Sequence, residues 1–209
     1  MFVLVLLAGC ESKDGIGFSG TQTSPYFPMD GDRTALYYNE NPEVAWTLHV
    51  EKQEPTQLVD GMEVVNFEYS NDTDGTILGI VQWSSTTGEG IKIHGYSEGT
   101  GDIVPFVPPI NVSDPTDYMN RNDVVTTETD QGTFTSEFVG FENCPVQWGI
   151  DNWDCLNLVL DDGDGDASAG RFFVGSYWLV TRYGPAWMQL TGYDEKWNLA
   201  DYDWSGEGS

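Results

Sequence analysis

Basic residues are scarce in this 209-residue chain. It has 8 Lys and Arg residues against 34 Asp and Glu residues, which gives a formal net charge of −26 at pH 7. Affinity for nucleic-acid phosphates comes from Lys and Arg, so this balance excludes a nucleic-acid partner. It also excludes adhesion to anionic lipid headgroups through charge. Such a surface repels other copies of itself and attracts cations.

The short motifs of common enzymes are absent as well. The chain contains no GxSxG, no HExxH and no glycine-rich phosphate loop. Its two histidines, His49 and His94, fall on the expected outer faces of strands, without an acidic partner at a fixed local spacing. Paired carboxylates carry no information, because 34 acidic residues create close pairs in any fold. We therefore expect a protein that is not an enzyme and holds no cofactor.

A long apolar run is missing too. Residues 1–8 are apolar and are followed by Gly9, Cys10 and an abrupt change to charged residues. A membrane-spanning helix needs about 20 apolar residues, so this run does not span. It matches the apolar stretch of a secretory signal, although no basic residue precedes it. Either the signal is unusually short or its true start lies upstream.

The four residues Leu7-Ala8-Gly9-Cys10 resemble the lipobox of bacterial lipoproteins. In that family the signal is cut before the cysteine, whose sulfur carries a diacylglycerol and whose new amine carries a fatty acyl chain such as palmitate. The resemblance therefore implies a lipidated Cys10. Two or more acyl chains anchor a protein stably where a single chain holds it only marginally. The expected partner at this end is a membrane.

The chain has three cysteines, so one pair remains if Cys10 carries the lipid. Cys144 and Cys155 are eleven positions apart in FENCPVQWGIDNWDCLNL. An even number of cysteines in an exported chain predicts a disulfide, and the alternative is two reduced cysteines in the core. A zinc site is disfavoured because there is no CxxC and neither histidine is near the pair.

Strand patterns recur along the chain while helix signals are almost absent. In VAWTLHVEK, the side chains of Trp46, Leu48 and Val50 share one face, which is the period-two alternation of a strand. VVNFEY repeats it through Val65, Phe67 and Tyr69. IKIHGY repeats it again, with Lys92 and His94 facing outward. TILGIVQW is apolar on both faces, as in a central strand. DIVPFVPPINVSDP has four prolines, which predicts an edge strand or a crossing loop.

These patterns predict an all-β domain of about ten antiparallel strands, either a sandwich or a strongly curved, half-barrel-like sheet. The hydrophobic fraction of 39% is enough for one core. We expect a signal peptide over residues 1–9, a lipidated cysteine with a flexible tether over 10–24, one β domain over 25–204, and a disordered tail over 205–209.

A second resemblance covers most of the mature chain. The opening SPYFPMDGDRTALYY is similar to that of a poorly characterised group of bacterial envelope lipoproteins, whose domains begin with a Tyr-Phe-Pro-Leu, Gly, aromatic pattern. The residues that match this pattern here are Tyr26, Phe27, Pro28, Met29, Gly31, Tyr37 and Tyr38. GEGIKIHGY and SYWLVTRYGPAWMQL resemble later segments of the same group. Met29 replaces the usual Leu, and no activity is established for the group. The resemblance implies a fold and a location in the cell envelope.

The stretch DDGDGDASAG contains the most metal-like pattern. Asp162, Asp164 and Asp166 have the 1, 3, 5 spacing of a calcium loop. A helix–loop–helix site also needs Gly at position 6 and Glu at position 12, where this chain has Ala167 and Phe173. The helical site is therefore excluded. A solvated acidic loop is the expectation, with weak Ca²⁺ binding as the alternative.

Two functions remain open from the sequence. The first is a non-catalytic, lipid-anchored binding or structural module of the bacterial cell envelope, at the outer membrane or the cell surface, that contacts an envelope protein or a glycan. The second is a carrier that shelters a lipid or other apolar ligand in a concave sheet. A ligand-sized cavity would favour the carrier, and a filled interior with aromatic side chains outside would favour the binding module.

Overall fold

The protein folds into one antiparallel sheet. In the computed structural model, the described residues are 24, 26–29, 33–59, 61–114, 120–144, 153–163, 171–181, 184–191 and 196–203. Within these ranges there are twelve strands and no helix, and accordingly no helical segment long and apolar enough to cross a membrane. The strands are β1 (Thr34–Asn39), β2 (Thr47–Val59), β3 (Met62–Asn71), β4 (Ile77–Thr86), β5 (Gly90–Glu98), β6 (Val104–Ser113), β7 (Asp123–Thr129), β8 (Gly132–Cys144), β9 (Trp153–Asp161), β10 (Gly175–Val180), β11 (Gly184–Leu190) and β12 (Trp197–Asp203).

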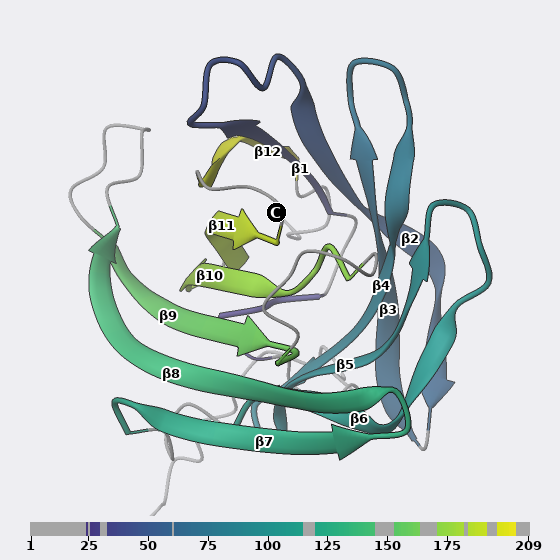
Figure 1. The fold of residues 1–209 in the computed structure, drawn as a ribbon, viewed down its shortest axis with the longest axis vertical. Coiled ribbons are helices and arrows are strands. Elements are labelled where there is room, and N and C mark those ends of the chain that lie inside the picture. The colour runs from purple at the N-terminus through teal and green to yellow at the C-terminus, as the bar shows by residue number, and fades with distance from the viewer. Residues whose placement is uncertain are drawn as a thin grey trace, which may run out of the picture.

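Strand order follows the chain almost throughout. The sheet runs β6-β5-β4-β3-β2-β1-β12-β11-β10-β9-β8-β7, so β1 and β12 join the two halves of the chain. The sheet curls until its edge strands β6 and β7 lie side by side (Figure 1). The all-β prediction is confirmed, and the curved sheet rather than the sandwich is the architecture. The two strands beyond the expected ten are β1, which was not predicted, and β6, the proline-rich edge strand.

The interior of the curled sheet is filled by aromatic and branched side chains. Trp83 is 1% exposed, and its ring lies 6.1 Å from that of Tyr177. Phe106 is 5.2 Å from Phe134 and stacks on Tyr96 at 5.5 Å. The alternation predicted for β2 and β3 is confirmed, because the buried residues of these strands include Leu48, Val50, Val65, Phe67 and Tyr69. Close packing of this kind stabilises the fold and leaves little room for a large guest.

The segment before β1 inserts into this interior. Phe27 is 6% exposed, stacks on Trp83 at 4.7 Å, and meets Phe67 edge-on at 5.9 Å. Met29 is 2% exposed in the same core. Ser24 was assigned to the tether, yet it is buried, and its carbonyl accepts a hydrogen bond from the amide of Phe27. Described structure therefore begins at the last residue of the expected tether.

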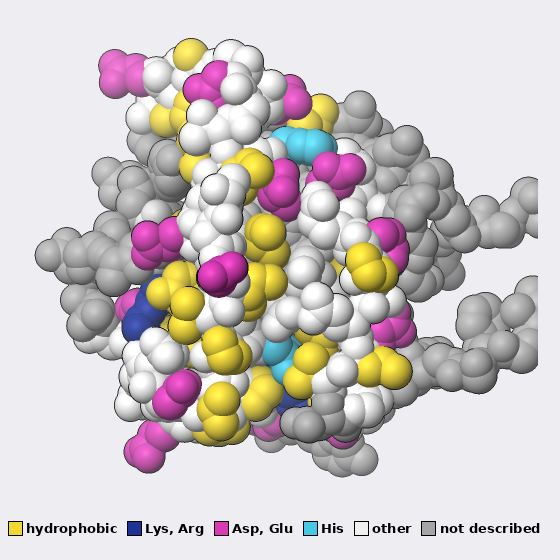
Figure 2. All heavy atoms as spheres, turned by 90° about the vertical axis from the view of Figure 1, so that its right-hand side faces the viewer, with side chains coloured by type: hydrophobic (Ala, Val, Ile, Leu, Met, Phe, Trp, Pro, Cys, Tyr) yellow, Lys and Arg dark blue, Asp and Glu magenta, His cyan; other side chains and the backbone are white. Residues whose placement is uncertain are grey.

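Acidic side chains outnumber basic ones on the part of the surface drawn in Figure 2. Figure 2 shows one face of the molecule, on which Asp and Glu are widely scattered and Lys and Arg are few. Hydrophobic side chains are also visible on this face. This distribution follows from the composition of 34 acidic and 8 basic residues.

Candidate functional site

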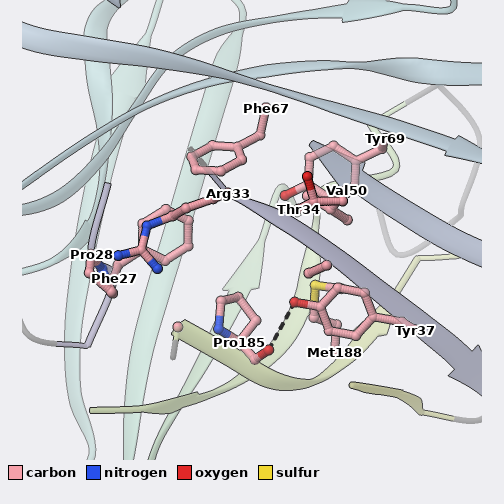
Figure 3. Close-up of a pocket in the computed structure, with 12 residues that line it drawn as sticks. Phe27, Pro28, Arg33, Thr34, Tyr37, Val50, Phe67, Tyr69, Pro185 and Met188 are labelled. Carbon is pink, nitrogen blue, oxygen red and sulfur yellow. Dashed lines mark hydrogen bonds between the residues drawn. The ribbon is translucent and has the colours of Figure 1, made fainter. Parts of the chain in front are cut away.

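A pocket opens between the N-terminal segment and the junction of the two halves of the chain (Figure 3). Its cavity volume is about 40 Å³. The wall residues come from the N-terminal segment, from β1, β2 and β3, and from β11: Phe27, Pro28, Arg33, Thr34, Ala35, Tyr37, Val50, Phe67, Tyr69, Gly184, Pro185 and Met188. In Figure 3, Arg33 lies beside Phe27 and Pro28 on one wall, and Thr34, Val50 and Tyr69 lie opposite.

The pocket combines an apolar lining with a few polar groups. The hydroxyl of Tyr37 donates a hydrogen bond of 2.9 Å to the carbonyl oxygen of Pro185. Burial raises the pKa of Tyr37 far above its usual value, and a smaller contribution comes from the nearby Tyr69 phenol. Burial also raises the pKa of Tyr69. Both phenols therefore stay neutral, and Arg33 is the one charged residue among the twelve that line this pocket.

A second aromatic group lies apart from the main core, on β10 and β11. Trp178 and Trp187 are cross-strand partners whose rings are 6.1 Å apart and nearly perpendicular. The ammonium of Lys196 lies 4.1 Å from the ring centre of Trp178 and 4.5 Å from that of Trp187. Glu142 accepts a hydrogen bond from the Trp178 indole at 3.2 Å. Lys196 therefore lies against both rings, and its cation–π attraction to them fixes the position of the start of β12.

The structure corrects the prediction for His94. Its side chain is only 5% exposed, and its Nε2 lies 2.8 Å from the Oγ of Ser84. Irregular register in the β5–β6 ladder between Ile93 and Gly95 places it there. A histidine beside a serine hydroxyl is the arrangement that activates a nucleophile. Ser84 is 1% exposed, however, so a substrate has no access to it in this conformation. His49 is half-buried, and its Nδ1 lies 3.5 Å from the Oγ of Ser70.

Of the three cysteines, the structure describes the side chain of Cys155 alone. Cys155 is fully buried and disulfide-bonded. The side chain of Cys144 lies outside the described part of the structure, although its backbone pairs with Trp153 in the β8–β9 ladder. Cys10 lies outside the described residues altogether. The pairing of Cys144 with Cys155 and the lipid on Cys10 both stay predictions.

The acidic loop is described only at its start. Asp162 forms an ion pair with Arg171, with 3.3 Å between Oδ2 and Nη1, and both side chains are mostly buried. Arg171 also donates to the carbonyl oxygen of Gln131. Asp164 and Asp166 lie outside the described residues. Among the residues that are described, no group of three His, Cys, Asp or Glu side chains could hold a metal ion. Weak Ca²⁺ binding stays a prediction.

Sequence reasoning did not identify the pocket. Its residues come from segments as distant as Phe27 and Met188, and no local spacing connects them. The one available signal was Arg33, because a basic residue within an aromatic opening segment is unusual in a chain with only 8 of them.

Comparisons with known proteins add little. No protein-family model matches the chain, and no curated protein matches it. A crystal structure of a candidate lipoprotein from Parabacteroides distasonis is similar at a TM-score of 0.40 and 11% sequence identity. The match covers 88% of this chain and 99% of that one. A likeness this distant carries no argument about this chain.

Proposed function

We propose that this protein is a lipid-anchored, non-catalytic binding module of the bacterial cell envelope. The anchor is proposed from Leu7-Ala8-Gly9-Cys10, because a cysteine after small residues at the end of an apolar run is the acceptor of lipid in bacterial lipoproteins. The observation that supports a binding module over a carrier is the filled interior of the sheet.

The size of the pocket supports the same choice. Sites for drug-sized ligands have volumes of about 300–1,000 Å³. The pocket beside Phe27 has about 40 Å³, and the rings of Phe27, Trp83 and Tyr177 occupy the interior next to it. A long acyl chain therefore has no space in the described interior unless the core rearranges.

An exposed aromatic side chain is the second support. Phe141 in β8 is 54% exposed. Its ring lies 6.1 Å from that of Tyr26 and 5.5 Å from that of Phe138. Exposed aromatic rings offer a large contact area to proteins and sugars. We place the contact with an envelope protein or glycan on this outer surface.

Membrane fractionation tests the anchor. The Cys10→Ala variant should leave the membrane fraction and should not incorporate labelled fatty acid, whereas the matched Ser12→Ala variant should behave like the wild type. Incorporation of fatty acid into Cys10→Ala, or its full retention in the membrane fraction, would contradict the proposal.

A further inference from the structure

We infer that the pocket beside Arg33 binds a short branched-chain carboxylate, with the carboxylate at Arg33 and the branched end against the apolar wall. The inference goes beyond the proposed function, and it is independent of both the lipid anchor and the contact on the outer surface. It assigns a ligand class to one end of the filled sheet, where the N-terminal segment meets β1 and β3 (Figure 3).

The charge of the lining selects the head group. The chain has 34 acidic residues, yet none of the twelve described lining residues is acidic, and one of them is Arg33. A guanidinium has five N–H donors in a planar fork, so it can bind a carboxylate in addition to contacts that it already makes. Thr34 adds a hydroxyl on the opposite wall. A ligand rich in acceptor oxygens fits these donors.

A neighbouring lysine does not compete for this role. The carbonyl oxygen of Arg33 accepts a hydrogen bond of 2.8 Å from the amide of Lys52. The ammonium of Lys52 is engaged by Glu54 at 3.1 Å, and its side chain is only 5% exposed. The charge that faces the pocket is therefore that of Arg33.

The size of the cavity selects the tail. The cavity has about 40 Å³, far less than the roughly 300–1,000 Å³ of sites for drug-sized ligands. A short branched tail such as an isopropyl group therefore suits it better than a long chain. Val50, Phe67 and Met188 provide the apolar contacts, and the neutral, buried phenol of Tyr37 closes one side.

Binding is tested with the full chain and two pairs of small probes. Isobutyrate and isovalerate should bind at least tenfold more tightly than isobutyramide and isovaleramide, which have the same tails without the charge. Isothermal titration or ligand-observed NMR measures the difference. Equal affinity for acid and amide, or no binding of either acid, overturns the inference, and neither result affects the fractionation test of the anchor.

Variants locate the site. Arg33→Gln should remove the preference for acid over amide, while Arg121→Gln, which changes an exposed arginine elsewhere, should leave it unchanged. Arg121 donates from Nε to the carbonyl oxygen of Val139, well away from the pocket lining. If Arg33→Gln retains the wild-type preference, the carboxylate is bound elsewhere and the inference is wrong. The acid–amide comparison on the wild type stands even if the variant unfolds.

Discussion

Main-chain hydrogen bonds join the two halves of the chain at β1 and β12, whereas side chains make most of the described bonds where β6 meets β7. The β1–β12 ladder has six residue pairs, from Thr34 with Asp203 to Asn39 with Trp197, and one irregularity after Leu36. Its inner side is covered by large buried side chains, among them Tyr37 and Trp197.

At the β6–β7 junction the bonds are of a different kind. The amide of Val107 donates to the Asp130 carboxylate at 2.9 Å, and the Val107 carbonyl oxygen accepts from the Asp130 amide. The amide of Asn111 donates to the Thr127 hydroxyl, and Ser136 of β8 donates to the carbonyl oxygen of Val112. Prolines explain the difference, since β6 includes three of them and a proline has no N–H to donate.

The contrast shows that the same sheet is closed by two sets of forces. The β1–β12 junction depends on packing behind a main-chain ladder. The β6–β7 junction depends on a few polar side chains, which make hydrogen bonds in place of main-chain pairs. These side chains bind main-chain amide and carbonyl groups of the edge strand, through which sheets otherwise aggregate. Four predictions test this contrast between packing and polar contacts, from the largest expected effect to the smallest.

Alkaline pH should destabilise the fold. Tyr37 in β1, Tyr69 in β3 and Tyr177 in β10 are buried, and burial raises the pKa of each above its usual value. The folded state therefore resists ionisation that the unfolded chain undergoes near pH 10. The contribution of these tyrosines to stability is constant below that pH. Above it, stability falls by about 1.4 kcal/mol per pH unit for each tyrosine, or by about 4 kcal/mol at pH 11.

Denaturant unfolding between pH 9 and 12 measures this slope. Tyr177→Phe should reduce the slope by about one third, because one of the three buried phenols is gone. It should also lower stability at neutral pH, since the hydroxyl of Tyr177 donates to the carbonyl oxygen of Phe173. A slope that is unchanged in this variant would contradict the explanation.

Truncation of Trp197 should have the next largest effect. Its side chain is fully buried on β12, and its ring lies 4.7 Å from that of Trp46. Replacement of a buried tryptophan by alanine costs about 3–5 kcal/mol through lost burial and a residual cavity. Trp187→Ala, at the half-buried tryptophan of β11, is the matched control and should reduce stability less. Equal losses of stability in the two variants would contradict the claim that packing behind β12 stabilises this junction.

Removal of polar side chains at the β6–β7 junction should reduce the free energy of unfolding by less, and it should open the structure only near that junction. Ser136→Ala removes the buried partner of the Val112 carbonyl oxygen, which costs about 1–3 kcal/mol. Asp130→Ala removes the acceptor of the Val107 amide at an exposed site and should cost about 0.5–1.5 kcal/mol. Faster hydrogen exchange at Val107 and Asn111, with β1 unchanged, identifies local opening. Thr135→Ala is the neighbouring control; a loss there equal to that of Ser136→Ala would refute the assignment.

The smallest change in stability is expected at a surface ion pair. Lys92 and Glu89 are 2.7 Å apart between Nζ and Oε2, and Glu89 is 56% exposed. Hydrogen bonding to Lys92 lowers the pKa of Glu89, so the pair stabilises the fold at neutral pH and loses this contribution as pH falls through the folded pKa. Lys92→Met should cost about 0–1 kcal/mol. NMR titration should show the pKa of Glu89 returning toward its usual value; no change would mean that Lys92 is not the cause.

Much of the sheet was predictable from alternation. Val65, Phe67 and Tyr69 were assigned inward from a period-two pattern, which depends only on strand geometry. β1 was missed because TALYYN is short and has no clear polar alternation. The closure of the sheet could not be predicted, since it depends on contacts such as Val107 with Asp130 between separate strands.

The sites were less predictable than the sheet. His94 was placed outside by alternation, but a local irregularity in register and its contact with Ser84 bury it. Asp162 was expected in a solvated loop, and its ion pair with Arg171 depends on where the loop returns to β10. Five separate segments of the chain form the pocket, and no pattern along the sequence indicates that they come together.

Native mass spectrometry of the protein, purified from the membranes of its own host, tests the central claim most directly. That claim is a lipid-anchored protein whose sheet is filled by its own side chains. We predict the mass of the chain beginning at Cys10 with covalently attached acyl groups, and no further lipid-sized ligand. A lipid that co-purifies without a covalent bond and leaves on unfolding would contradict the claim and support the carrier function instead.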